Sequence, residues 1–384
     1  METVLFITDL HTGAHVLELA GVFERAAVHG WRVIEVERDR ASQPLAESFK
    51  TWNPAGCIME CGKLTDAIDT SAFANVPIVY IDPDRKTIAR GANCVTNDAS
   101  AIAGRAADEL MKLDNASYAY VAWRAPTPWS VSRGEAFMRI MRAGNKRFHL
   151  YDKPWQDTCQ IQKDLARWLK PLPRPIGIFA ANDHVAEQVA GACQLAGLES
   201  PRDAAIIGVD NDELACENCV PTLSSIEPDF KEAGRLAADL LAEILANPAQ
   251  KPKHLHFGPV ALHRRQSTRS VNTGDIRIIR AVEHIRRDAV NGLTAAQIIA
   301  EIGLSRRLAE KRFLAATGRT ILGEIQEMRF ARVLRLLETT DLPIGQIAGL
   351  CGWESDSYLK RFFKARTGMT LREWRAKHTT PAKA

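Results

Sequence analysis

The sequence has no long hydrophobic run, and this absence argues against a membrane-spanning helix. No stretch of about 18 apolar residues occurs among its 384 residues. The first residues, METVLFITD, contain neither a basic segment nor a small-residue cleavage site, so no secretion signal is expected. Eight cysteines are too few for a disulfide framework in a chain of this length. These features predict a cytoplasmic protein with reduced thiols.

Catalytic signatures are also missing. The sequence has no phosphate-binding glycine loop, no GxSxG serine elbow and no HExxH zinc motif. Cys216 and Cys219 have the spacing of half a zinc site, but no second Cys or His pair follows at the required distance. We therefore expect that the protein is not an enzyme and that it binds neither a metal nor another cofactor. An enzyme would need a nucleophile–base pair or a phosphate loop near the strand ends.

Charge is distributed unevenly along the chain. Residues 270–384 contain 20 Lys and Arg against 12 Asp and Glu, whereas the preceding residues contain 30 against 34. An acidic body followed by a basic C-terminal region predicts that the last third binds a polyanion. Nucleic acid is favoured over a membrane surface, because this region lacks a long, strongly amphipathic basic helix.

The first 268 residues alternate β-rich runs with amphipathic segments. The predicted helices include residues 16–29, 99–113, 133–142 and 184–195. The predicted strands are residues 3–9, 31–36, 56–61, 77–82, 117–122, 148–152, 177–182 and 204–210, with a last one at 254–263. This alternation is typical of parallel sheets with helices on both faces, and the number of units favours two α/β lobes.

Several predicted strands end in polar residues. Open α/β sheets bind ligands at the carboxyl ends of their strands, so these residues predict a binding cleft. Alternatively, each of them could cap the helix that follows. The residues are Asp9, Asp82, Asn182 with Asp183, and Asp210.

The C-terminal region contains an internal repeat of helices. We predict a linker at residues 269–275 and helices only from residue 276 to 384, where the apolar period becomes 3.6. Gly303, Phe313 and Thr317-Gly318 recur 49–50 residues later as Gly352, Phe363 and Thr367-Gly368. Each copy predicts a helix-turn-helix, near residues 295–316 and 343–366. A helix over residues 323–339 would join them across roughly 25 Å, close to one turn of DNA, on the order of 34 Å.

The C-terminal region resembles the AraC-type DNA-binding domain over its whole length, including Cys351-Gly352-Trp353 and the following SYLKRFFKARTGMTLREWR. The body resembles the sensors of LacI-type repressors and ribose-type binding proteins. The matching segments are RGEAF (133–137), FAANDH (179–184), IIGVDND (206–212) and LSSIEPDF (223–230). This order of domains is similar to that of bacterial xylose operon regulators. The resemblance implies an α/β two-lobed periplasmic-binding-protein-like (type I) sensor domain followed by an all-α double helix-turn-helix domain.

The resemblance also implies a site for a polyol between two lobes. The Arg, Asn and Asp that bind the ligand in these sensors correspond to Arg133, Asn182 and Asp210. We expect Arg133 in one lobe, and Asn182 and Asp210 in the other. Charged and amide groups suit a sugar hydroxyl, which both donates and accepts hydrogen bonds. Asp82 matches a ribose-type ligand, although Pro83 stands where an Arg would follow.

Further ligand-binding candidates have competing structural roles. Asp183 could cap a helix instead of binding a ligand. Trp129 could stack on a sugar ring or act as a hydrophobic staple for the next helix. Asp9 and His11 end the first strand, at the mouth of the cleft in this fold.

The same resemblance places the DNA-reading faces on the second helix of each repeat. Arg can read guanine, whereas Lys311 and Lys360 could equally bind phosphate. Glu310 and Asp356 would accept from cytosine or pair with neighbouring basic groups. Phe313, Phe363, Leu308 and Leu359 are expected in the core on the opposite face. The predicted DNA-binding residues are Arg306, Arg307, Glu310 and Lys311 in the first copy, and Asp356, Ser357, Tyr358, Lys360 and Arg361 in the second.

Together these features predict a sugar-responsive transcription regulator, an activator of pentose catabolism genes with a xylose-like effector. Its expected partners are double-stranded operator DNA, the sugar and a second copy of the chain, with RNA polymerase as a further contact. Two alternatives remain: an architectural DNA-binding protein without a ligand, and an enzyme on the α/β body.

Overall fold

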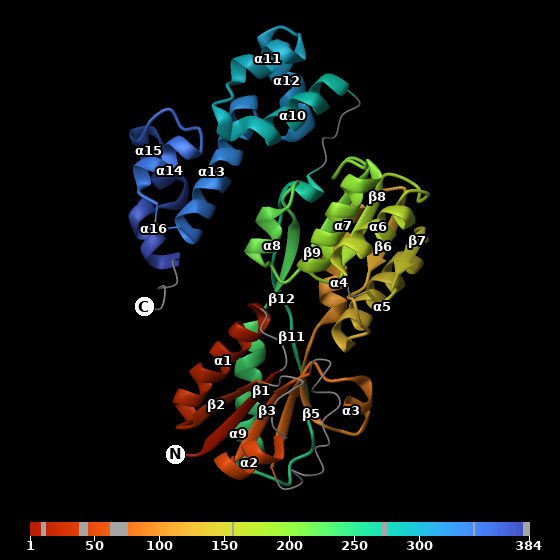
Figure 1. Cartoon of the computed structure of the whole chain (residues 1–384), viewed down its shortest axis with the longest axis vertical. Coiled ribbons are helices and arrows are strands. Elements are labelled where there is room, and N and C mark those ends of the chain that lie inside the picture. Colours follow the sequence, from red (N-terminus) through yellow and green to blue (C-terminus); the bar gives the residue numbers. More distant parts are fainter. Residues whose placement is uncertain are drawn as a thin grey trace. The chain divides into compact units, whose positions relative to one another are not determined.

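The computed structural model describes residues 1–8, 13–37, 45–61, 76–155, 157–269, 275–340 and 342–378. The chain divides into two compact units, Met1–Arg269 and Ser270–Ala384 (Figure 1). The first unit is α/β with two sheets and the second is helical. The predicted fold class is confirmed. In the described residues, no helix is both long and apolar enough to cross a membrane.

The first sheet of the sensor unit has six parallel strands in the order β11-β5-β4-β3-β1-β2. Alternate residues of β1 enter different layers. Val4 and Phe6 pack with α1 and α9, whereas Leu5 and Ile7 pack with Phe49 of α2. The strands are β1 (Thr3–Thr8), β2 (Arg32–Glu37), β3 (Gly56–Glu60), β4 (Ile78–Ile81), β5 (Asn93–Asn97) and β11 (His254–Phe257). The helices are α1 (Gly13–His29), α2 (Leu45–Trp52), α3 (Arg85–Ala89) and α9 (Phe230–Ala246).

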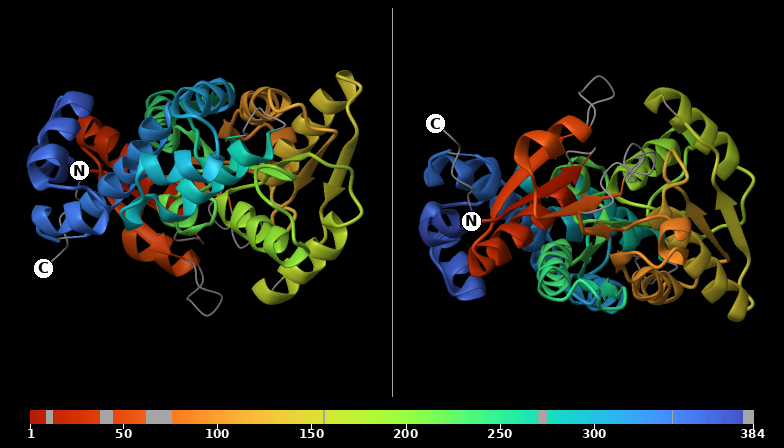
Figure 2. Two further views of the ribbon diagram at one scale, coloured as in Figure 1. Left: turned by 90° about the horizontal axis from the view of Figure 1, so that it is seen from above. Right: turned by 90° about the horizontal axis from the view of Figure 1, so that it is seen from below.

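The second sheet also has six strands, in the order β12-β10-β9-β8-β6-β7, with β12 antiparallel to β10. Helices lie on both of its faces (Figure 2). In its core the ring centre of Phe179 lies 5.3 Å from that of Tyr120 and 5.2 Å from that of Phe137. The strands are β6 (Ser117–Val121), β7 (Phe148–Tyr151), β8 (Ile176–Ala180), β9 (Ala204–Val209), β10 (Ser224–Pro228) and β12 (Pro259–His263). The helices are α4 (Ala99–Met111), α5 (Pro128–Ala143), α6 (Thr158–Leu169), α7 (Asp183–Ala196) and α8 (Glu213–Asn218).

The chain passes between the two sheets after β5, after β10 and between β11 and β12. These connections are held together by backbone hydrogen bonds. The N–H of Asp98 donates to the carbonyl of Phe257 at 2.8 Å, and the N–H of Asp229 donates to that of Gly258 at 3.0 Å. Each sheet with its helices is therefore a lobe, and the lobes share one set of adjacent connections.

Two features of the sensor differ from the sequence prediction. The predicted strand 254–263 is two strands, β11 and β12, which separate at Gly258 and join different sheets. Strands β5 and β10 were not predicted, because their sequences NCVTN and SSIEP are unusually polar. Their polar groups find partners elsewhere in the fold: Asn97 donates to Asp82, and the Ser224 hydroxyl lies 2.8 Å from that of Thr268.

The polar segment before the predicted linker is part of the sensor. Gln266–Thr268 form a 3-10 helix in which Ser267 and Thr268 are buried. The Ser267 hydroxyl donates to the carbonyl of Ile206 at 2.6 Å. Of the predicted linker, residues 270–274 lie outside the described residues, while Asp275 caps the first helix of the second unit and accepts from the N–H of Arg277.

The second unit consists of two small helical cores joined by the long helix α13. The first core includes Ile278, Ile298 and Phe313, and the second includes Leu337, Ile347 and Phe363. The helices are α10 (Ile276–Asp288), α11 (Ala295–Ile302), α12 (Arg306–Thr317), α13 (Ile321–Thr339), α14 (Ile344–Leu350), α15 (Asp356–Thr367) and α16 (Leu371–His378). The pairs α11–α12 and α14–α15 correspond to the two predicted helix-turn-helix motifs.

The sequence repeat is also a repeat of hydrogen bonds. At the end of α12 the Thr317 hydroxyl donates to the carbonyl of Phe313 and accepts from the N–H of Arg319. Thr367 makes the same two contacts with Phe363 and Met369 at the end of α15. One core assignment is wrong: Leu308 is 37% exposed, whereas Phe313, Leu359 and Phe363 are fully buried as predicted.

Candidate ligand-binding and nucleic-acid sites

Arg133 is the centre of a polar cluster at the carboxyl end of the second sheet. Its Nη1 donates to the carbonyl of Ala181 at 2.8 Å and lies 3.8 Å from the carboxylate of Asp210. Its guanidinium carbon is 5.0 Å from the centre of the Trp129 ring, a cation–π distance. Its Nε is buried and has no hydrogen-bond partner among the described residues. A fixed guanidinium with a free donor can receive a ligand oxygen.

The predicted lobe assignment of Arg133 is wrong. Arg133 lies on α5, which follows β6, so it shares the second lobe with Asn182 and Asp210. The chain enters this lobe at α4, before the RGEAF segment that contains Arg133. The segments that resemble known sensors do not show where the chain crosses between the lobes. The other half of any site between the lobes must therefore come from residues of the first sheet.

Asn182 and Asp183 hold the local backbone at the start of α7. The amide oxygen of Asn182 accepts from the N–H of Val185 at 3.0 Å, and Asp183 accepts from the N–H of Asp212 at 2.8 Å. A Cβ on Gly208 would lie 2.1 Å from the Asp183 carboxylate, so glycine is needed beside it. Burial raises the pKa of Asp183 to about 8. Asp183 therefore holds the loop that follows β9.

Asp210 is the first residue of that loop and has a strained backbone. Its φ is 105°, in a region that non-glycine residues rarely adopt, and such strain is often found at functional sites. Its N–H donates to the carbonyl of Ile226 at 2.9 Å. Burial raises the pKa of Asp210 to about 7, although the nearby Arg133 opposes the shift. The loop thus presents a carboxyl group close to Arg133.

Asp82 supplies a carboxyl group from the first lobe. It follows β4 with a φ of 48°, and its Oδ1 accepts from the backbone N–H and the side-chain amide of Asn97, at 2.7 and 2.9 Å. Burial raises its pKa, while the Asn97 hydrogen bonds and then the charge of Arg133 lower it. Arg133 of the second lobe is thus one of the charges that influence Asp82 of the first.

Three residues that the sequence analysis missed extend the first-lobe cluster. Glu60 ends β3 and accepts from the Thr8 hydroxyl at 2.6 Å, and its carboxylate lies 3.3 Å from Nδ1 of His15. The other ring nitrogen of His15 lies 2.9 Å from Glu35. Glu18 is 3% exposed, and burial followed by neighbouring carboxylates raises its pKa well above the usual value.

One signal in the sequence pointed to this cluster. His15 and Glu18 occupy the buried face of α1 at helical spacing, where apolar residues are expected. Two other predicted ligands, Asp9 and His11, lie outside the described residues.

The DNA-reading candidates lie on the second helix of each helix-turn-helix. Arg306, Arg307 and Lys311 on α12, with Lys360 and Arg361 on α15, are exposed and form no ion pair among the described residues. Five such cations suit a phosphate backbone and the acceptor edges of bases.

The other candidates have partners within the unit. Glu310 accepts from the N–H of Ile321 at 3.2 Å, and the Tyr358 hydroxyl accepts from Gln326 at 2.6 Å. The Tyr358 ring also contacts Trp353, with ring centres 5.5 Å apart. Asp356 and Ser357 lie in the first turn of α15. These contacts favour a supporting role for Glu310 and Tyr358.

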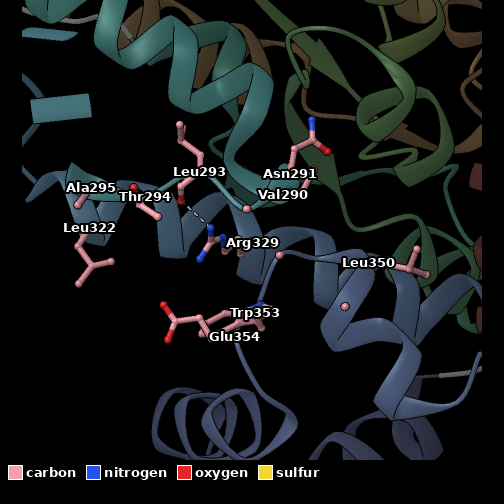
Figure 3. Close-up of a pocket in the computed structure, with 13 residues that line it drawn as sticks. Val290, Asn291, Leu293, Thr294, Ala295, Leu322, Arg329, Leu350, Trp353 and Glu354 are labelled. Carbon is pink, nitrogen blue, oxygen red and sulfur yellow. Dashed lines mark hydrogen bonds between the residues drawn. The ribbon is translucent and has the colours of Figure 1, made fainter. Parts of the chain in front are cut away.

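A groove of about 690 Å³ marks the junction of the two helical halves (Figure 3). Arg329 of α13 closes one side by donating to the carbonyls of Ala289 and Leu293 at 2.8 and 2.7 Å. Gly352 approaches the carbonyl of Val290 so closely, with a φ of 70°, that a Cβ there would lie 2.6 Å from the oxygen. The two halves are therefore held together by Arg329 of α13 and by the close approach of Gly352 to Val290.

Comparison with known protein families finds a match within each unit. Residues 107–268 match the family described as periplasmic binding protein-like domain, and residues 298–377 match the helix-turn-helix domain. Thus a sensor-type domain and a DNA-binding domain occur in one chain, in the order that the sequence analysis predicted.

Individual proteins are similar to this chain over most or part of its length. The chain is 29% identical to the xylose operon regulatory protein of Haemophilus influenzae over 286 residues, 73% of this chain and 74% of the relative. It is 30% identical to that of Escherichia coli over 253 residues, 64% of each chain. The solved structure of a xylose-binding transcription activator superposes with a TM-score of 0.75 and 24% identity, covering 99% of both chains. A ribose operon repressor from Lactobacillus acidophilus matches with a TM-score of 0.58 and 18% identity over 69% of this chain and 97% of its own.

Proposed function

We infer that this protein is a sugar-responsive DNA-binding transcription regulator. It joins a periplasmic binding protein-like sensor to an AraC-type helix-turn-helix domain, which is the architecture of the xylose operon regulators. The observation that carries this function is the polar cluster at the carboxyl end of the second sheet, where Arg133 lies 3.8 Å from Asp210, in a chain that also contains paired DNA-reading helices. A ligand that contacts both lobes stabilises their closed arrangement, which is the differential affinity that a switch needs.

The effector of this regulator is a monosaccharide of the pentose class. The relatives named for xylose and ribose support this class. Arg133 and Asp210 of the second lobe, together with Asp82 of the first, bind its hydroxyls, and the Trp129 ring covers one face. Asn182 and Asp183 hold the loop and helix that carry these groups. Asp9 and His11 remain proposed ligands at the mouth of the cleft.

The sensor and the linker are coupled through Arg265. Its Nη2 donates to the side-chain oxygen of Asn211 at 2.9 Å, next to the ligand residue Asp210, and its Nε donates to Glu217 at 2.6 Å. Arg265 also precedes the 3-10 helix that ends the sensor. A ligand that moves the loop after β9 therefore moves the segment that enters the linker. Arg265→Met should leave sugar affinity within about twofold but reduce the effect of sugar on DNA binding.

On DNA, the proposed reading face consists of residues from α12 and α15. Arg306, Arg307 and Arg361 read bases, and Lys311 and Lys360 bind phosphate, with Ser357 and Asp356 at the edge of the second helix. Two copies of the chain, forming a homodimer in the cytoplasm, bind a pair of half-sites and activate transcription through contact with RNA polymerase. Sedimentation and a reporter gene, each with and without sugar, test the dimer and the sign of regulation.

A calorimetric titration of the whole chain with common aldoses and ketoses tests the function directly. We expect heat with at least one monosaccharide, and a change in the DNA footprint at the same concentration. A chain that binds operator-like DNA but gives no heat and no footprint change with any sugar would instead be a ligand-free architectural protein. That protein would bind DNA without sequence preference and with a steep salt dependence.

A further inference from the structure

Acidic groups outnumber basic groups where the two lobes interact. Glu18 of α1 experiences repulsion from three other carboxylates, Glu60 and Asp82 in its own lobe and Asp210 in the second. Among the described residues, two basic side chains lie within ion-pair distance of this group. Arg133 is 3.8 Å from Asp210, and His15 lies between Glu60 and Glu35. This group therefore has an excess of potential negative charge.

Glu18 differs from Glu60 and Asp82 in its hydrogen bonding. Glu60 accepts from Thr8 and Asp82 accepts from Asn97, but the buried Oε2 of Glu18 has no hydrogen-bond partner among the described residues. Glu18 follows His15 by one helical turn on the buried face of α1, and His15 contacts Glu60 of this group. An unpartnered buried carboxyl group is costly, and a bound cation would remove that cost.

We propose that the effector is an amino sugar, a pentose-class monosaccharide in which an ammonium group replaces one hydroxyl and pairs with Glu18. This inference rests on the proposed function of the site as a sugar sensor. A neutral sugar can hydrogen-bond to carboxylates but cannot offset their mutual repulsion when the lobes close. An ammonium group supplies three donors and the missing charge.

Calorimetry with matched pairs tests the proposal on the whole chain. The pairs are D-xylose with 2-amino-2-deoxy-D-xylose and L-arabinose with 4-amino-4-deoxy-L-arabinose, and each N-acetyl derivative is the uncharged control. We expect one amino sugar to bind at least about tenfold more tightly than both its parent and its N-acetyl form. Titrations in buffers of different ionisation enthalpy should show proton release, because Glu18 loses its proton when the ammonium binds.

Variants of one helix then locate the interaction. Glu18→Gln should abolish the preference for the amine while keeping affinity for the parent sugar. Glu24→Gln is the control: Glu24 lies on the same helix, is exposed and pairs with Lys231 and Arg235, so the preference should persist. The comparison of sugars on the unmodified chain is independent of whether a variant folds.

Three outcomes overturn the inference. Equal or tighter binding of the neutral parent sugar would refute it and leave the sugar-sensor function intact. A preference for the amine that survives Glu18→Gln would refute the role of Glu18. No binding of any sugar in any pair would remove both this inference and the proposed function.

Discussion

Arg133 and Asp210 lie 3.8 Å apart at the end of one sheet, joined by charge but held by different contacts. Arg133 is fixed by the carbonyl of Ala181, whereas Asp210 begins a strained loop. The two side chains are therefore already positioned in the absence of ligand. A ligand that binds both of them avoids the entropic cost of ordering them.

Removing Arg133 should weaken effector binding and leave effector-free DNA binding nearly unchanged. Arg133→Ala removes the guanidinium from Asp210 and Asp82, while the DNA-reading helices belong to a different unit. We expect the affinity for sugar to fall at least about tenfold. A footprint titrated with sugar measures this, and the exposed Arg139→Ala on the same helix is the control. A footprint that responds at the parental concentration would exclude Arg133 from the site.

The stability of the sensor should fall as the pH rises from about 4 to 8. The pKa of Asp183 is about 8 in the folded chain, against about 4 for an ordinary Asp, so the folded state binds more protons across this interval. Its contribution to stability is complete below about pH 4 and is lost through pH 8. Asp183→Asn should flatten the dependence of the melting temperature on pH. Asp164→Asn, on α6 and paired with Arg167, serves as the control, and an unchanged slope in Asp183→Asn would contradict the prediction.

Arginines on both reading helices should contribute to specific DNA binding. We expect Arg307→Ala and Arg361→Ala each to cost about 1–3 kcal/mol on the operator, and affinity to fall steeply with salt. Fluorescence anisotropy at several salt concentrations measures both effects. Arg287→Ala, on α10 and paired with Asp288, should bind as the parent does. Parental affinity in both reading-helix variants would refute the assigned faces.

Arg329 should stabilise the junction between the two helical halves. Arg329→Met leaves the buried carbonyls of Ala289 and Leu293 without their donors, at a cost of about 3 kcal/mol. Hydrogen exchange in α10 and α13 should then be roughly 100-fold faster, since about 1.4 kcal/mol corresponds to tenfold. Arg332→Met, exposed on the same helix, should exchange at the parental rate. Equal protection against hydrogen exchange in both variants would show that the hydrogen bonds of Arg329 do not stabilise the junction.

Local patterns in the sequence predicted most of the elements, because helices and strands follow short-range periodicity. The repeat of Gly, Phe and Thr-Gly predicted two helix-turn-helix motifs, and the structure repeats the same threonine hydrogen bonds. The polar residues at the ends of β4 and β9 could be predicted for the same reason, because Asp82 and Asp210 directly follow apolar runs in the sequence.

Long-range contacts decided the rest. The lobe of Arg133 depends on where the chain crosses between sheets, and the polar strands β5 and β10 depend on partners such as Asp82 and Thr268, distant in sequence. Glu18 is one carboxyl group of an amphipathic helix until the fold places Glu60, Asp82 and Asp210 near it. The sequence by itself determined the elements, the repeat and the order of the domains. The tertiary structure decided which charges share a low-dielectric environment, because burial and proximity arise only when distant segments pack.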